Sequence, residues 1–276
     1  MNIGVDIGGT NLRAGIEVGG MITRQHQVLL KNKESLSSTL LQLMDLIRPL
    51  TKYPVKGIGI GVPSVVNVDK GIVYNVMNIP SWEEVALKDI MQNEFNLPVS
   101  INNDVNCFIL GEHRFGLAQK YKSVIGMTIG TGLGSGIIID NHLYAGNNCG
   151  AGEIGMLPYR DSILENYVSN RFFEDNLGIN AFDAHKAAID GKSDALETWK
   201  EFGVHLGAVI KALMYTYDPE AIVLGGSITK ANQFFKPSML ESLRDFAYPE
   251  SIRRLTLLLS EDDNIALLGA SALLGE

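Results

Sequence analysis

Cysteine is scarce in this sequence: Cys107 and Cys149 are the only two among its 276 residues. Two cysteines are too few for a disulfide framework or for a zinc site with four cysteine ligands. The pattern therefore favours a reducing compartment. We expect each cysteine to be buried as a small apolar side chain.

The sequence also lacks the features of a secreted, membrane-bound or nucleic-acid-binding protein. No charged segment followed by an apolar run opens it, and no apolar run is long enough to span a bilayer. Its 31 Asp and Glu outnumber its 23 Lys and Arg, so the formal net charge of -8 disfavours binding to phosphate backbones or anionic lipid. We expect a cytoplasmic protein with no membrane and no nucleic acid among its partners.

What the sequence does have is an alternation of short apolar strands and amphipathic helices, which is typical of α/β architecture. With 46% apolar residues the chain can bury a substantial core. One helix is predicted to end at Pro49, and Leu36, Leu40, Leu43, Met44 and Ile47 are predicted to face the core from it. The other helices are predicted over 83–95, from about 105, and over 195–217, 235–246 and 265–275, and strands over 3–8, 11–17, 22–30, 55–62, 71–76, 98–102, 123–130, 135–140, 221–226 and 254–260.

Two glycine-rich segments share a strand, turn, strand pattern: IGVDIGGTNLRAGI (3–16) and IGMTIGTGLGSGII (125–138). Backbone N–H groups at such turns can cradle phosphate oxygens, because glycine allows close approach and positive φ. A plain hairpin would use the same glycines for shape alone, and chance similarity is the alternative to an internal duplication. If the duplication is real, two similar α/β lobes can direct these turns at each other across a cleft. The Walker pattern GxxxxGK[ST] is absent.

Polar residues gather where strands are predicted to end. Asn103 and Asp104 follow the strand 98–102 at the start of a helix, where side chains can reach a cleft, although either one could be a simple helix cap. Glu153 lies in a glycine-flanked loop, and Gly225 and Gly226 end the strand that begins at residue 221. These positions favour ligand contacts.

In their order along the chain these segments resemble the sugar kinases of the ROK family, and the resemblance covers nearly the whole sequence. DIGGTN (6–11) and TIGTGLGSG (128–136) are similar to its two phosphate motifs, NNDVN (102–106) to its catalytic motif, and IVLGGSI (222–228) to its adenosine motif. The resemblance implies a two-lobed α/β fold of the ribonuclease-H-like (actin/hexokinase) type with a central cleft. The lobes would comprise 1–113 with the returning helix 265–276, and 114–264.

The activity that this resemblance implies is ATP-dependent phosphorylation of a free hexose, with ATP and Mg²⁺ as cofactors and glucose as the first choice of sugar. N-acetylglucosamine, N-acetylmannosamine, allose and fructose are the alternatives. Asp104 would be the catalytic base, and Asp6 would hold Mg²⁺ through water. The implied sugar-binding residues are Ser64, Asn78, Asn103, Asp104, Glu153 and Glu165. The implied ATP-binding residues are Asp6, Gly8, Gly9, Thr10, Asn11, Thr131, Gly132, Gly225 and Gly226.

One departure from the family concerns its zinc site. Met156 stands where the family has a histidine, and no cysteine lies between residues 150 and 276, so we expect no structural zinc. The departure leaves the sugar undetermined.

Two further classes remain as alternatives: a non-catalytic sugar sensor, and a ROK-type transcriptional regulator without its DNA-binding domain. The regulator is disfavoured because the first predicted strand begins at residue 3, before any helix-turn-helix. A homodimer is left open.

Overall fold

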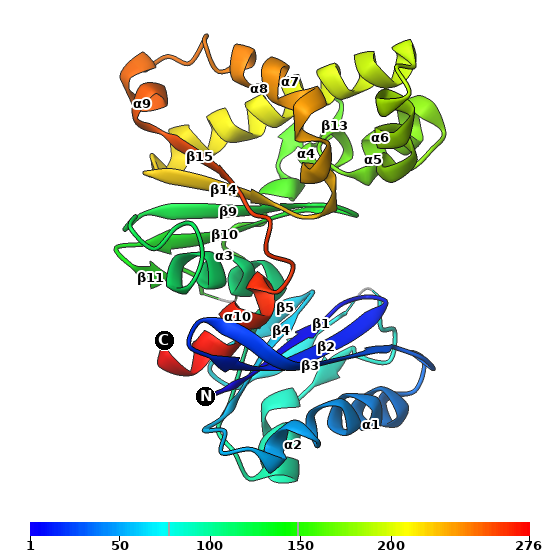
Figure 1. Ribbon diagram of the computed structural model, residues 1–276, viewed down its shortest axis with the longest axis vertical. Coiled ribbons are helices and arrows are strands. Elements are labelled where there is room, and N and C mark those ends of the chain that lie inside the picture. Colours follow the sequence, from blue (N-terminus) through cyan, green and yellow to red (C-terminus); the bar gives the residue numbers. More distant parts are fainter. Residues whose placement is uncertain (77, 148) are drawn as a thin grey trace. The chain divides into compact units, whose positions relative to one another are not determined.

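The computed structural model describes residues 1–76, 78–147 and 149–276 (Figure 1). By the density of its internal contacts the chain forms two compact units. Because three separate segments build the first unit, residues distant in the sequence share one core. The first unit comprises Met1–Lys122, Gly136–Ala151 and Asp262–Glu276, and the second comprises Ser123–Ser135 and Gly152–Glu261.

The first unit is built on a five-stranded sheet with the order β3-β2-β1-β4-β8. β1 (Ile3–Ile7) runs antiparallel to β2 (Asn11–Val18), which pairs with β3 (Met21–Leu29). On its other side β1 runs parallel to β4 (Ile58–Val62), and β4 runs parallel to β8 (Val99–Asn103). The carboxyl ends of β1, β4 and β8 therefore meet at one edge of the sheet, where ligands bind in open parallel sheets.

Helices cover both faces of this sheet. α1 (Leu36–Ile47) and α2 (Leu87–Phe95) lie on one face, and α3 (Asp104–Arg114) and α10 (Ile265–Ala272) lie on the other (Figure 1). α10 packs so closely on the sheet that a Cβ at Gly59 would lie 1.7 Å from the carbonyl oxygen of Ala270. A small sheet of β5 (Val65–Asn67), β6 (Ile72–Tyr74) and β7 (Glu84–Val85) completes the unit.

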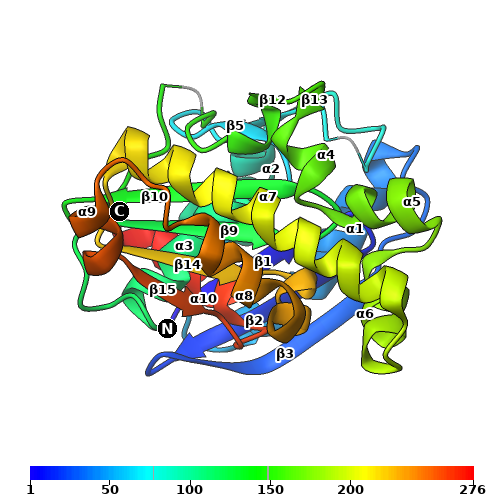
Figure 2. The ribbon, with the colours of Figure 1, turned by 90° about the horizontal axis from the view of Figure 1, so that it is seen from above.

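The second unit is built on strands of another sheet, with a helical layer above it. β14 (Ala221–Gly225) runs parallel to both β9 (Val124–Ile129) and β15 (Thr256–Leu259). The full strand order of this sheet is β11-β10-β9-β14-β15. Of these strands, β11 (His142–Leu143) and the part of β10 (Leu133–Ile139) from Gly136 onward belong to the segment Gly136–Ala151 of the first unit. The long helix α7 (Ser193–Tyr217) crosses above this sheet beside α8 (Asn232–Ser242) (Figure 2). The remaining elements are β12 (Pro158–Tyr159), β13 (Ser162–Ile163), α4 (Leu164–Tyr167), α5 (Asn170–Leu177), α6 (Ala181–Ile189) and α9 (Pro249–Arg254).

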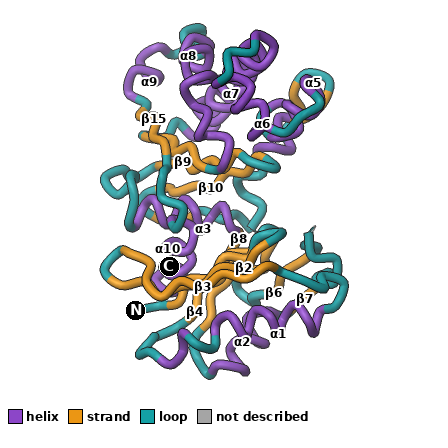
Figure 3. Tube along the Cα trace, turned by 45° about the vertical axis from the view of Figure 1, so that its right-hand side comes forward, coloured by secondary structure: helices purple, strands orange, loops and turns teal. Residues whose placement is uncertain are grey.

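Helices and strands are distinguished by colour in Figure 3. Each unit has a separate hydrophobic core. In the second unit, Trp199, Phe173 and Phe235 are fully buried at the centre of this core. Among the described residues, no helix has both the length and the apolar character needed to cross a bilayer.

Two sequence predictions in the first unit are wrong in detail. Leu36 was predicted to face the core but is 38% exposed, and Thr39 is buried instead because its hydroxyl bonds to the helix backbone and to Trp82. Residues 84–85 do not belong to the predicted helix 83–95. They pair with β6 as strand β7, so the helix begins at Leu87.

Candidate active site

The turn after β1 places one set of the predicted phosphate-binding residues at the carboxyl edge of the first sheet. The N–H of Gly8 donates to the carbonyl oxygen of Asn11 at 2.9 Å, which closes the hairpin, and Thr10 is exposed at its tip. Neither Gly8 nor Gly9 has a positive φ, contrary to the conformational reason given for glycine here. Close packing is the reason at Gly9, because a Cβ there would lie 2.7 Å from Nδ2 of Asn78. Asn78, predicted to bind sugar, thus lies against the turn predicted to bind phosphate.

Two cations that the sequence did not single out lie at this turn. Arg13 donates from Nε and Nη2 to Oδ2 of Asp6, at 3.0 and 2.7 Å. Lys33 donates from Nζ to the carbonyl oxygen of Gly9. Positive charge beside backbone N–H groups suits an anionic ligand such as a phosphate.

The junction of β8 and α3 holds the predicted catalytic residue. Asn103 is the N-cap of α3: its Oδ1 accepts from the N–H of Val105 at 2.8 Å, and its Nδ2 donates to the carbonyl oxygen of Ser64 at 3.3 Å. The capping alternative therefore holds for Asn103. Asp104, the first residue of the helix, is partly exposed, and its Oδ1 accepts from the same Val105 N–H at 2.9 Å. A carboxylate here interacts favourably with the helix dipole.

Glu153 and Glu165 lie near each other in the second unit. Partial burial raises the pKa of Glu153, and the neighbouring Glu165 carboxylate raises it further, although solvent still reaches the Glu153 side chain. Glu165, on α4, accepts at Oε2 from the N–H of Leu133 at 3.0 Å. This bond ties Glu165 to the turn that contains Thr131 and Gly132.

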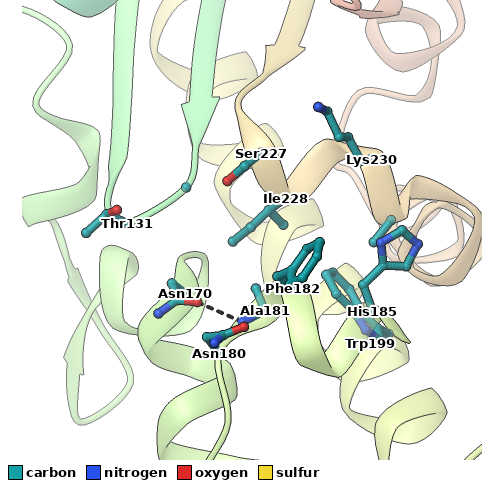
Figure 4. Close-up of a pocket in the computed structure, with 12 residues that line it drawn as sticks. Thr131, Asn170, Asn180, Ala181, Phe182, His185, Trp199, Ser227, Ile228 and Lys230 are labelled. Carbon is teal, nitrogen blue, oxygen red and sulfur yellow. Dashed lines mark hydrogen bonds between the residues drawn. The ribbon is translucent and has the colours of Figure 1, made fainter. Parts of the chain in front are cut away.

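A cavity of about 510 Å³ lies wholly within the second unit (Figure 4). This is a typical size for a small-molecule site. Of the predicted residues, Thr131 lines the cavity, whereas Gly132, Gly225 and Gly226 do not. The lining residues are Gly130, Thr131, Asn170, Asn180, Ala181, Phe182, His185, Trp199, Ser227, Ile228, Lys230 and Ala231.

Gly226 shapes this cavity without lining it. Its φ is +94°, and a Cβ would lie 2.4 Å from the carbonyl oxygen of Ile129, so only glycine fits. The turn that follows places Ser227 and Ile228 in the wall. On another side, the N–H of Ala181 donates to Oδ1 of Asn170 at 2.7 Å, which joins the start of α6 to that of α5 (Figure 4).

Most of the cavity wall was missed by sequence reasoning. Phe182 and His185 come from α6 and Trp199 from α7, and none of them lies in a glycine-rich motif. Phe182 is 66% exposed, which is unusual for a large apolar side chain, but exposure is not visible in a sequence. The position of Lys33 likewise had no signal in the sequence around it.

The expected metals are magnesium at Asp6 and no structural zinc. No group of three or more His, Cys, Asp or Glu among them is arranged to hold an ion, and the absence of zinc stays a prediction. Met156 is 55% exposed. Magnesium usually binds through one or two carboxylates, several waters and substrate phosphates. The Asp6 carboxylate fits this pattern, because both hydrogen bonds from Arg13 go to its Oδ2 and none goes to its Oδ1.

Comparison with known proteins places these features in a family. Residues 2–276 match the profile of the ROK family. The chain belongs to this family. The ROK membership and the mixed α/β fold predicted from the sequence are therefore confirmed.

Proteins similar to this chain include both regulators and enzymes. The xylose repressor of Bacillus spizizenii is 29% identical over 100% of this chain and 77% of the repressor. The glucokinase of Streptomyces coelicolor is 29% identical over 83% of this chain and 82% of that enzyme. The solved ROK family glucokinase of Streptomyces griseus in complex with glucose and AMPPNP has a TM-score of 0.81 at 26% identity, covering 99% of this chain and 98% of that one.

Proposed function

We propose that this protein transfers the terminal phosphoryl group of ATP to a hydroxyl of a free hexose, with glucose and its 6-hydroxyl as the first candidate. The observation that carries the proposal is the position of Asp104 at the first turn of α3, next to the carboxyl ends of parallel strands. Phosphoryl transfer needs an acceptor for the proton of the attacking hydroxyl, and an aspartate in this position can serve. The glucokinases among the relatives support a sugar as the substrate.

The nucleotide is assigned to the cavity of the second unit. Phe182 and Ile228 offer apolar surface to a base, while Thr131, Ser227 and Lys230 offer hydrogen bonds and a positive charge to the ribose and phosphates. The complex of the Streptomyces griseus glucokinase with AMPPNP supports a nucleotide ligand.

The first unit is assigned the sugar and part of the phosphate contacts. The Gly8 and Gly9 turn, with Lys33 and Arg13 beside it, suits negative charge. Asp6 is assigned to Mg²⁺, whose role when bound with ATP is to neutralise charge on the phosphates. Ser64 and Asn78 are assigned to the sugar, as are Glu153 and Glu165 of the second unit.

The test is an ADP-release assay with ATP, Mg²⁺ and a panel of sugars: glucose, mannose, fructose, allose, xylose, N-acetylglucosamine and N-acetylmannosamine. We expect sugar-dependent ADP release, and a phosphate on the 6-position of the product by phosphorus NMR. Reactions without sugar control for ATP hydrolysis. Release that no sugar stimulates would contradict the proposal.

A regulator that binds sugar without turnover is the second candidate, because the match to the xylose repressor spans 100% of this chain. Calorimetry with xylose and glucose separates the two functions. A sugar that binds but releases no ADP in the presence of ATP and Mg²⁺ would favour the regulator.

A further inference from the structure

A buried polar network joins the catalytic turn to a second loop of the first unit. Asn102, the residue before the helix cap, accepts three hydrogen bonds at its single Oδ1. The donors are the N–H of Asn103 at 2.8 Å, Nδ2 of Asn106 at 2.9 Å and Sγ of Cys149 at 3.1 Å. One amide oxygen thus connects the end of β8, the first turn of α3 and Cys149.

The network is closed to solvent. Asn102 is 5% exposed, Asn106 1% and Cys149 3%. Buried polar groups are costly unless paired, so these hydrogen bonds constrain the geometry strongly. Within the part of the chain that the structure describes, Oδ1 of Asn106 is buried without a hydrogen-bond partner. The side chain of Asn106 is thus oriented by its Nδ2 alone. This nitrogen donates to Oδ1 of Asn102 and lies 3.5 Å from Sγ of Cys149.

The backbone at Cys149 is also unusual. Its φ is +60°, in the left-handed region that a residue with a Cβ rarely adopts. Glycine would adopt this conformation without strain, so the backbone alone does not explain a cysteine here. The thiol hydrogen bond to Asn102 does explain it, because glycine could not make that bond.

We propose that Asn102 and Cys149 are positioning residues that hold the turn carrying Asn103 and Asp104 in register for phosphoryl transfer. The thiol fixes Cys149 and the described residues of the loop around it, where the Ala151 N–H donates to the Ala145 carbonyl oxygen at 3.2 Å. Through Asn102, this loop and α3 then move as one body. Small displacements of a reacting group cost large factors in rate, so loss of the thiol bond lowers the rate of the chemical step. This role rests on the proposed kinase function.

The chain offers a matched set of variants. Cys149→Ser keeps a donor, Cys149→Ala removes it, and Cys149→Gly removes it while relieving the positive φ. Cys107→Ala is the control: Cys107 is also buried, at 1% exposure, and lies on α3, but it packs beside Gly61.

Two measurements test the role. Cys149→Ala and Cys149→Gly should lower kcat by roughly tenfold with the KM for ATP unchanged, while Cys149→Ser and Cys107→Ala stay within about twofold of the parent. Amide hydrogen exchange over residues 102–106 should speed up by roughly tenfold in the Ala and Gly variants of Cys149 alone. Because exchange needs no turnover, it tests the network even if the parent protein phosphorylates no sugar.

The outcomes separate the two ideas. Unchanged exchange over 102–106 in Cys149→Ala overturns the network. Faster exchange with an unaltered kcat shows a merely structural link and also overturns the positioning role. A parent without turnover whose Cys149 variants still exchange faster refutes the proposed function and supports the mechanical link between loop and turn.

Discussion

Glu165 accepts a hydrogen bond at Oε2 from the backbone N–H of Leu133, at 3.0 Å. The residue proposed to bind sugar is therefore also an anchor for the turn that contains Thr131, which lines the candidate nucleotide cavity. We therefore expect Glu165→Gln, which keeps the shape of the side chain, and Glu165→Ala, which shortens it, to affect the two substrates differently.

We expect Glu165→Gln to raise the KM for sugar by roughly tenfold or more while the KM for ATP stays near the parental value. The amide removes the charge that pairs with sugar hydroxyls but keeps an oxygen for Leu133. Glu165→Ala should raise both constants, because the turn loses its anchor. Steady-state kinetics with each substrate varied in turn checks the split. Equal effects of the two variants on ATP would refute the anchoring role.

Asp104→Asn should lower kcat by roughly 10²- to 10⁴-fold, the usual contribution of a positioned base. The asparagine can still accept from the Val105 N–H, so the melting temperature and ATP binding should stay close to those of the parent. Turnover measured at saturating sugar and ATP, with calorimetry for the nucleotide, makes the comparison. Near-parental turnover would show that Asp104 is not the base.

The raised pKa of Glu153 predicts an acid limb in the pH profile. Burial and then Glu165 shift this pKa upward from 4.5, so the carboxylate that would bind sugar is lost by protonation at a higher pH than for an ordinary glutamate. We expect kcat/KM for sugar to fall on acidification with a midpoint above 4.5. Glu153→Gln should have a low kcat/KM without this limb.

Protonation of Glu153 cannot produce the acid limb of kcat/KM by unfolding the protein. Because its folded pKa is raised, Glu153 binds protons more readily in the folded state. Its contribution to stability is therefore present at low pH and lost as the pH rises through the folded pKa. An acid limb that persists unchanged in Glu153→Gln would assign it to another group.

Phe182→Ala should raise the KM for ATP by roughly five- to 150-fold, since stacking on a nucleobase contributes about 1–3 kcal/mol for an aromatic side chain. Stability should change little because Phe182 is 66% exposed. Ile189→Ala is the matched control: it lies on the same helix, is 62% exposed and is outside the cavity wall. If both variants behave alike, the base does not bind at Phe182.

Local patterns in the sequence predicted much of the fold. Strand, glycine turn, strand segments gave β1, β2, β9 and β10 within two residues, because these hairpins depend on neighbours in the chain. The prediction that Leu36 faces the core was wrong because helical periodicity does not show how far a core extends along a helix. The helix predicted at residues 84–85 was wrong because these residues form a strand only through pairing with β6.

The candidate site was predictable only where motifs mark it. Asp104 was located by the strand-to-helix junction, which is visible in the sequence. Phe182 and Trp199 reach one cavity through the packing of α6 and α7, which no local pattern specifies. Cys149 was correctly expected to be buried, but its bond to Asn102 joins residues far apart in the sequence.

The discontinuous make-up of the first unit bears on synthesis at the ribosome. Its sheet is covered on one face by α10, which comes from the segment Asp262–Glu276, whereas the second unit is complete once Glu261 has emerged. An emerging chain therefore holds the faces of β1 and β4 that await α10 open to solvent until translation is nearly finished. Unfinished packing of this kind exposes a chain to misfolding during synthesis, so the amino-terminal segment of the first unit stays vulnerable longest.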